Sequence, residues 1–141
     1  MSELIDIGVN LTDKRFQNDI DEVINRAKAS HISAMLITGT SLASSQKAIA
    51  LCQQHPGYLY ATSGIHPHDA SSMTDIALEE LASLSEQDCI VAIGETGLDF
   101  NRNFSTPEEQ VIAFEQQVTL AKSTQLPLFL HERDATEKQI Q

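Results

Sequence analysis

Short apolar runs recur along this 141-residue chain at intervals of about 25 to 40 residues. Within each run the hydrophobic residues are nearly consecutive and do not alternate with polar ones. That pattern is typical of parallel strands covered on both faces. The runs predict five strands, over Leu4–Val9, Ala34–Thr38, Leu59–Gly64, Ile90–Gly94 and Pro127–His131.

The segments between these runs have the spacing of amphipathic helices, with apolar residues three or four positions apart. The last of them has the clearest start. Thr106 can cap the helix, Pro107 suits its first turn, and Glu109 can complete a capping box. Four helices are therefore predicted, around Phe16–Ala27, Leu42–Cys52, Ile76–Leu84 and Val111–Ala121.

Strands that alternate with helices predict an α/β fold with a parallel sheet. An open five-stranded doubly wound sheet would be complete at this length. The alternative is the first five strands of a TIM-type (β/α)8 barrel, which typically needs ~250 residues. Periodicity alone favours the open sheet. No linker or charge run divides the chain, so residues 1–141 are expected to form a single domain.

Composition narrows the classes of function. The formal net charge of −11 argues against broad, nonspecific coating of nucleic acid, which needs a basic surface. It permits an enzyme that grips a few phosphates through metal ions and arginines. No apolar run approaches the ~20 residues that span a bilayer. The start of the chain lacks a signal-peptide pattern, so we expect a cytoplasmic protein without a membrane partner.

Metal-binding residue types stand at the ends of three consecutive predicted strands: His66, Glu95 and His131. The carboxyl ends of parallel strands form the active site in both architectures, so these side chains should lie together. Imidazole suits Zn²⁺, and carboxylate oxygen suits Mg²⁺ or Mn²⁺. One such residue alone more often caps a helix or pairs with a neighbour. Three on adjacent strands predict a divalent-metal site and hydrolysis by a metal-activated water.

Further polar residues flank these positions: His68, Arg102 and Arg133. A guanidinium there can hold a phosphate bidentately, so we predict substrate contacts for this group. The alternatives are that His68 supports a ligand or only ends its strand, and that each arginine pairs with Asp99 or Asp134. No Gly-rich phosphate loop of standard spacing is present, so no nucleotide cofactor is expected.

Together these segments resemble the TatD family of metal-dependent hydrolases, and the resemblance covers the whole chain in order. It rests on Gly64–His68, Ala92–Phe100, Asn101–Gln110 and Leu130–Asp134. It implies a (β/α)8 barrel of which this chain supplies about the first five strands, against the preference drawn from periodicity. It also implies a deoxyribonuclease that cleaves phosphodiester bonds, acting as an exonuclease on single-stranded DNA.

The resemblance assigns roles by motif position. Glu95 and His131 carry over as metal ligands at the catalytic centre, and His66 as an active-site histidine near metal or phosphate. Many relatives open with Asp-x-His-x-His, whereas this chain has Gly8 and Asn10 at the histidine positions. Asn10 still offers an oxygen for a substrate contact. The loss of those histidines favours Mg²⁺, with Mn²⁺ or Zn²⁺ as alternatives.

The chain ends at Gln141, soon after the fifth strand. The family's later histidine on the sixth strand and aspartate on the eighth have no counterpart. We therefore expect a fragment of a longer enzyme, the alternative being assembly with another copy. Two other functions stay open: a metal-dependent hydrolase of a small ester, lactone or amide, and a truncated remnant that binds without turnover.

Overall fold

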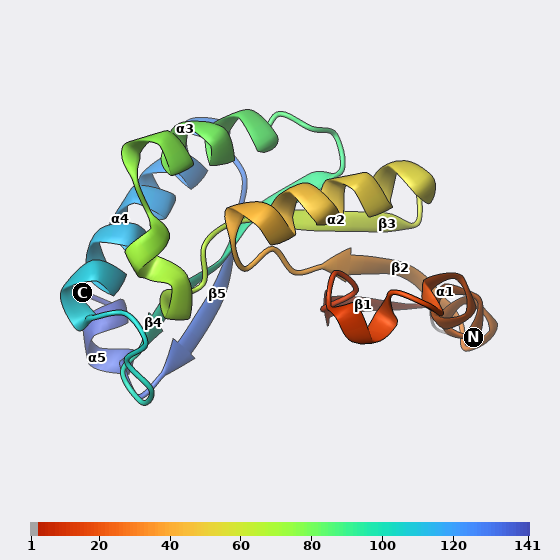
Figure 1. Ribbon diagram of the computed structural model, residues 1–141, viewed down its shortest axis with the longest axis horizontal. Helices are drawn as coiled ribbons and strands as arrows, with labels where there is room; N and C mark the ends of the chain where they lie inside the picture. Colours follow the sequence, from red (N-terminus) through yellow and green to blue (C-terminus); the bar gives the residue numbers. More distant parts are fainter. Residues whose placement is uncertain (1–2) are drawn as a thin grey trace.

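The computed structural model describes residues 3–141 as one curled sheet of five parallel strands with helices between them (Figure 1). Each strand pairs in parallel with the next strand in sequence. The strands are β1 (Leu4–Val9), β2 (Ile32–Ile37), β3 (Leu59–Ser63), β4 (Ile90–Asp99) and β5 (Leu128–Arg133). A doubly wound sheet reverses its strand order at a switch point, whereas here the order is β1-β2-β3-β4-β5. The open-sheet alternative was therefore wrong.

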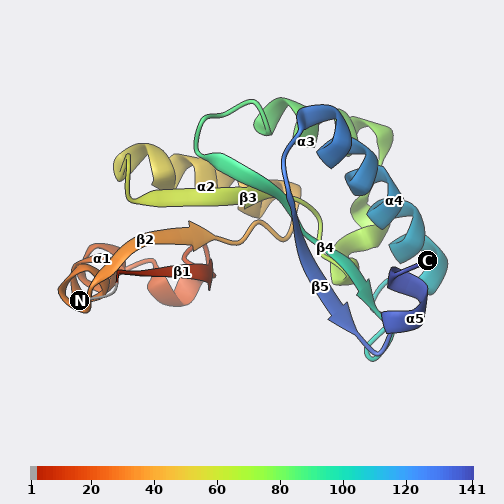
Figure 2. The same cartoon turned by 180° about the vertical axis from the view of Figure 1, so that it is seen from behind.

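Helices connect consecutive strands, and α2, α3 and α4 lie on one side of the sheet (Figures 1 and 2). The first predicted helix begins later than expected, because Phe16 falls in the short 3-10 turn η1. Among residues 3–141, no helix combines the length and apolar character needed to cross a membrane. The helical elements are η1 (Lys14–Phe16), α1 (Ile20–Ala29), α2 (Leu42–Gln54), η2 (Pro67–Ser72), α3 (Asp75–Leu84), α4 (Pro107–Thr124) and α5 (Thr136–Gln139).

The predicted capping box at the start of α4 is confirmed. Thr106 Oγ1 accepts a hydrogen bond from the Glu109 backbone N–H at 3.2 Å, and Glu109 Oε2 accepts one from the Thr106 N–H at 2.8 Å. Both N–H groups would otherwise lack partners in the first turn. Pro107 occupies the first turn, where its missing N–H costs nothing. The capping box therefore fixes the residue at which α4 begins after the loop that follows β4.

Strand β4 is longer than predicted, and the extension reaches the site. The apolar run stops at Gly94, but pairing with β5 continues to Asp99, opposite Arg133. Gly97 permits this close pairing, because a Cβ atom there would collide with the carbonyl oxygen of His131. The additional residues place the carboxylate of Asp99 at the end of β4. The apolar pattern did not predict this position.

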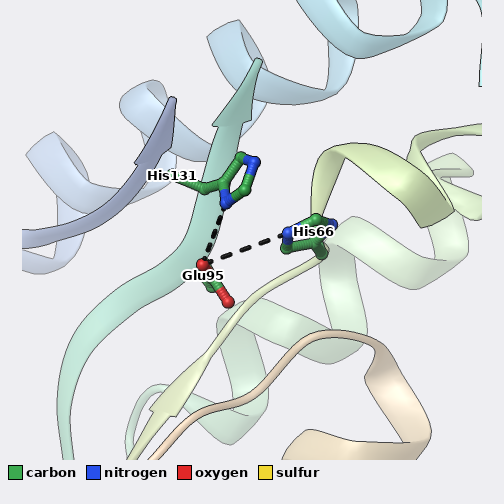
Figure 3. A group of neighbouring side chains, drawn as sticks. All are labelled: His66, Glu95 and His131. Atoms are coloured by element: carbon green, nitrogen blue, oxygen red, sulfur yellow. Dashed lines mark hydrogen bonds and ion pairs between the residues drawn. The ribbon is translucent and has the colours of Figure 1, made fainter. Parts of the chain in front are cut away.

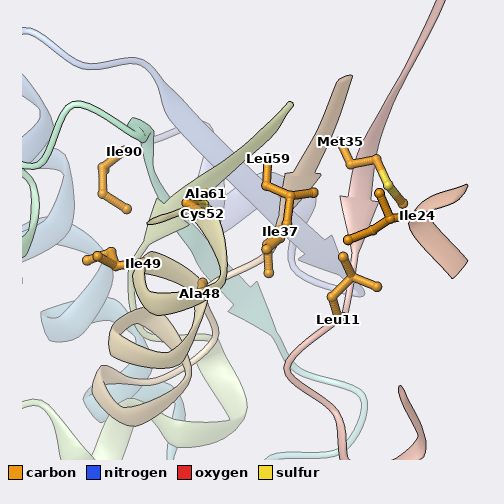
Figure 4. Packing of buried hydrophobic residues seen from close by; sticks show 10 residues of the cluster. All are labelled: Leu11, Ile24, Met35, Ile37, Ala48, Ile49, Cys52, Leu59, Ala61 and Ile90. Atoms are coloured by element: carbon orange, nitrogen blue, oxygen red, sulfur yellow. The ribbon is translucent and has the colours of Figure 1, made fainter. Parts of the chain in front are cut away.

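The hydrophobic core consists of two apolar clusters. One packs β1, β2 and β3 against α1 and α2 (Figure 4). The other lies beneath α3 and α4 and includes Ile65, Leu81 and Ile93. Each fully buried aliphatic side chain contributes about 1.5 to 3 kcal/mol relative to an exposed one. The first cluster is formed by Leu11, Ile24, Met35, Ile37, Ala48, Ile49, Cys52, Leu59, Ala61 and Ile90.

The edge strands β1 and β5 each have one pairing partner in the described part of the chain. They carry exposed apolar side chains, including Ile5, Ile7 and Leu130. In a closed barrel such edges would be paired and the side chains covered. The architecture is therefore that of a half-barrel.

Candidate metal site

Three predicted ligands from neighbouring strands meet in the structure (Figure 3). His66 follows β3, Glu95 lies in β4 and His131 lies in β5. One ligand atom from each lies within 4.8 Å of the others. Glu95 Oε1 is 3.3 Å from His131 Nδ1 and 4.0 Å from His66 Nε2. Two imidazoles and a carboxylate are a donor set that suits a divalent ion.

Asp99 adds a carboxylate that was not predicted as part of the site. Its side chain is 1% exposed. Oδ2 accepts hydrogen bonds from His68 Nε2 at 2.9 Å and from His131 Nε2 at 3.0 Å. Oδ1 accepts from the backbone N–H groups of Asn101 and Arg102. Burial would raise the pKa of Asp99, but these hydrogen bonds outweigh it and lower the pKa from 3.8 to about 2.

The ionised Asp99 determines which nitrogen of the His131 ring faces Glu95. We call the group His66, Glu95 and His131 the cluster. A carboxylate can only accept, so the ring proton of a neutral His131 lies on Nε2. The Nδ1 lone pair then faces Glu95 Oε1 across 3.3 Å. Two acceptors at that distance are stabilised by a cation or proton between them. In a carboxylate–histidine–metal arrangement, Nδ1 could hold an ion while Asp99 supports the ring through Nε2.

His66 reaches the cluster as a neutral ring. Its Nδ1 accepts a hydrogen bond from the backbone N–H of His68 at 3.0 Å. Burial, together with the neighbouring His131 and His68, lowers the pKa of His66 from 6.5 to about 4. The proton of neutral His66 therefore lies on Nε2 and points toward Glu95. To bind an ion through Nε2, the ring would have to move this proton to Nδ1 and release the His68 N–H.

The structure connects the predicted substrate contacts to the cluster to different extents. His68 joins it through Asp99, whose Oδ2 lies 2.9 Å from His68 Nε2. Asn10 follows β1, and within residues 3–141 no hydrogen bond joins its side chain to the cluster. Arg133 stands at the exposed end of β5, and Arg102 in the loop after β4.

The expected alternative for the two arginines, an ion pair with Asp99 or Asp134, is not observed. Neither guanidinium pairs with a carboxylate in the part of the chain that the structure describes. Asp99 is occupied by the two histidines, and Asp134 Oδ2 accepts from Asn101 Nδ2 at 2.8 Å. Two exposed arginines without a carboxylate partner in the described range thus follow or end the strands β4 and β5.

Comparison with known proteins identifies the group of enzymes that these features belong to. A family model described as TatD related DNase matches residues 5–141. The chain belongs to this family. It is 52% identical over 132 residues to the 3'-5' ssDNA/RNA exonuclease TatD of Pectobacterium carotovorum, covering 94% of this chain and 51% of that protein. It is 47% identical over 135 residues to the protein of the same name from Salmonella typhimurium, covering 96% and 52%.

Solved structures of TatD proteins confirm the half-barrel. A TatD-family hydrolase from Entamoeba histolytica superimposes with a TM-score of 0.91 at 34% identity, over 99% of this chain and 52% of that one. A TatD homologue from Escherichia coli gives 0.86 at 28% identity, over 96% and 53%. The chain thus spans about half the length of the relatives it matches. The predicted first five strands of a TatD barrel are confirmed.

Proposed function

We propose that this chain forms part of the active site of a TatD-type exonuclease that hydrolyses phosphodiester bonds in single-stranded DNA. The observation that carries the proposal is the meeting of Glu95, His131 and His66 from three neighbouring strands, with buried Asp99 orienting His131. The relatives, named as 3'-5' exonucleases of single-stranded DNA and RNA, supply the substrate class.

Glu95 Oε1 and His131 Nδ1 are the proposed metal ligands and the catalytic pair. A divalent ion bound there would activate a water molecule and polarise the phosphoryl group. Mg²⁺ is the preferred ion because Gly8 and Asn10 replace two histidines, and Mn²⁺ or Zn²⁺ are alternatives. His66, held neutral, offers its Nε2–H to Glu95 or to a phosphate oxygen, or serves as a third ligand after its ring proton moves.

The exposed Arg102 and Arg133 are proposed to bind phosphate oxygens. Arg102 follows the carboxyl end of β4 and Arg133 ends β5, and both lack a carboxylate partner among residues 3–141. A net charge of −11 disfavours nonspecific binding of nucleic acid elsewhere on the surface. The two guanidiniums would therefore direct the nucleic acid to the carboxyl ends of β4 and β5. Asn10, at the tip of β1, is retained as a further proposed contact.

Glu95→Gln tests the proposal, because it removes the charge and keeps the size. We expect Mn²⁺ affinity, measured by calorimetry, to fall at least tenfold, and Mg²⁺-dependent hydrolysis of a labelled single-stranded oligonucleotide to disappear. Glu79→Gln, on the exposed face of α3, is the matched control and should change neither. Unchanged turnover by Glu95→Gln at saturating Mg²⁺ would remove Glu95 from the site.

The same assay separates the alternatives. Hydrolysis of carboxyl esters, lactones or amides without cleavage of DNA would favour the small-substrate hydrolase. Metal binding that depends on Glu95 without any turnover would favour a non-catalytic chain. Running the full-length Pectobacterium relative alongside shows whether the assay detects a complete enzyme of this family.

A further inference from the structure

An aromatic side chain stands exposed beside the candidate metal site formed by His66, Glu95 and His131. Phe104 lies in the loop between β4 and α4 and is 66% exposed. Among the large apolar residues exposed in the described range, it alone is aromatic. The other phenylalanine and tyrosine rings within residues 3–141 are at least partly buried. Its position therefore calls for an explanation other than packing within this chain.

The Phe104 ring borders the cluster through one histidine. Its centroid lies 4.9 Å from that of His68, and the planes meet at 79°. The His68 ring in turn lies 4.4 Å from the His66 ring and 6.2 Å from the His131 ring. This edge-to-face contact uses one side of the aromatic system and leaves a large part of the ring open to solvent.

The loop that carries Phe104 is held at both ends. Gln110, fully buried, accepts from the Asp99 N–H at 2.8 Å and donates to the carbonyls of Asp99 and Ser105, each at 3.0 Å. The hydroxyl of Ser105, the next residue, donates to the carbonyl of His68 at 3.1 Å. These bonds position the exposed ring next to the cluster.

The same loop carries a cation. The Arg102 side chain is exposed and has no carboxylate partner among residues 3–141, while its backbone N–H donates to Asp99 Oδ1. An aromatic face and a guanidinium two residues apart match the two chemical parts of a nucleotide, its base and its phosphate.

We propose that Phe104 stacks against a nucleobase of a single-stranded nucleic acid whose backbone lies at the metal cluster, with Arg102 contacting a neighbouring phosphate. This inference rests on the proposed function and adds a binding subsite to it. Stacking requires an unpaired base, so the subsite favours single strands over duplexes. Every base has a π-face, so it tolerates any sequence and accepts DNA or RNA.

The sequence contains no tryptophan, so Phe104→Trp would introduce a single fluorophore at the proposed subsite. The probe is a short oligothymidylate with non-hydrolysable linkages, titrated in the presence of Mg²⁺. We expect saturable quenching of the Trp fluorescence. Ile76→Trp is the control, because Ile76 lies on α3 and is 69% exposed, and its fluorescence should not change.

Affinity measurements separate stacking from other contacts. Phe104→Ala should weaken binding of the oligothymidylate about tenfold. Binding of the abasic counterpart, which has the same phosphates without bases, should not change. Phe104→Leu keeps much of the apolar volume and should lose most of the same affinity. Ile112→Ala on the exposed face of α4 is the truncation control, and circular dichroism confirms that each variant folds.

The possible failures are distinguishable. An oligothymidylate that binds the wild-type chain and Phe104→Ala equally would overturn the subsite and leave the proposed function standing. Equal losses for the base-bearing and abasic probes would also overturn stacking. If the wild-type chain binds neither probe with Mg²⁺ present, the proposed function is overturned, and the subsite with it.

Discussion

Acidification is expected to destabilise the metal-free chain through His66. The pKa of this buried ring is lowered from 6.5 to about 4. Below pH 6.5 the unfolded chain takes up a proton at this position, whereas the folded chain does not until about pH 4. The unfolded state therefore gains stability relative to the folded state throughout that window. The free energy of unfolding falls as the pH falls, and the loss is complete below both pKa values.

The size of this effect follows from the difference between the two pKa values. One pKa unit corresponds to about 1.4 kcal/mol, so a shift from 6.5 to about 4 amounts to roughly 3 kcal/mol. Roughly 2 kcal/mol should already be lost at pH 5. The side chain is 12% exposed, so solvent screening reduces the effect little. Against a typical total of about 5 to 15 kcal/mol, this loss is readily measurable.

Urea unfolding in the presence of EDTA at pH 7, 6 and 5 measures the effect. His66→Gln cannot take up the proton, so the difference in free energy of unfolding between the wild-type chain and this variant should change by roughly 2 kcal/mol from pH 7 to pH 5. The control variant is His31→Asn, at an exposed histidine. Asparagine is chosen because His31 has a left-handed backbone conformation, φ 61°, which asparagine adopts more readily than most residues. A wild-type–His66→Gln difference that stays constant with pH would refute the reasoning.

Two further predictions concern side chains that orient others. Asp99→Asn allows the ring proton of His131 to leave Nε2, so we expect Mn²⁺ affinity to fall about 10- to 100-fold by calorimetry, and imidazole ¹⁵N shifts to report a changed tautomer. Identical ¹⁵N shifts in the wild-type chain and Asp99→Asn would contradict the conclusion that Asp99 holds the His131 proton on Nε2. Thr106→Ala removes the cap of α4 and should lower the free energy of unfolding by about 1 kcal/mol in urea, an effect absent from exposed Thr119→Ala.

The strands and the meeting of His66, Glu95 and His131 could be predicted because both depend on local patterns. Apolar runs locate strands, and parallel strands bring their carboxyl ends to one edge, so His66, Glu95 and His131 had to be neighbours if consecutive strands were adjacent. Strand order is a long-range property. A strand covered on both faces has the same pattern in an open sheet and in a barrel, so periodicity favoured the wrong architecture. The motifs shared with the TatD family corrected it.

Asp99 was missed because the apolar run of β4 ends at Gly94, and a strand was not expected to continue through polar residues. The alternation of side chains along a strand was the signal that could have identified Asp99. Side chains on a strand point to opposite faces in turn, so Glu95, Gly97 and Asp99 share one face. Gly97 between the two acids lets the backbone of β5 approach at His131. One strand thus presents Glu95 to Nδ1 of His131 and Asp99 to Nε2, and the added pairing fixes the orientation of the His131 ring.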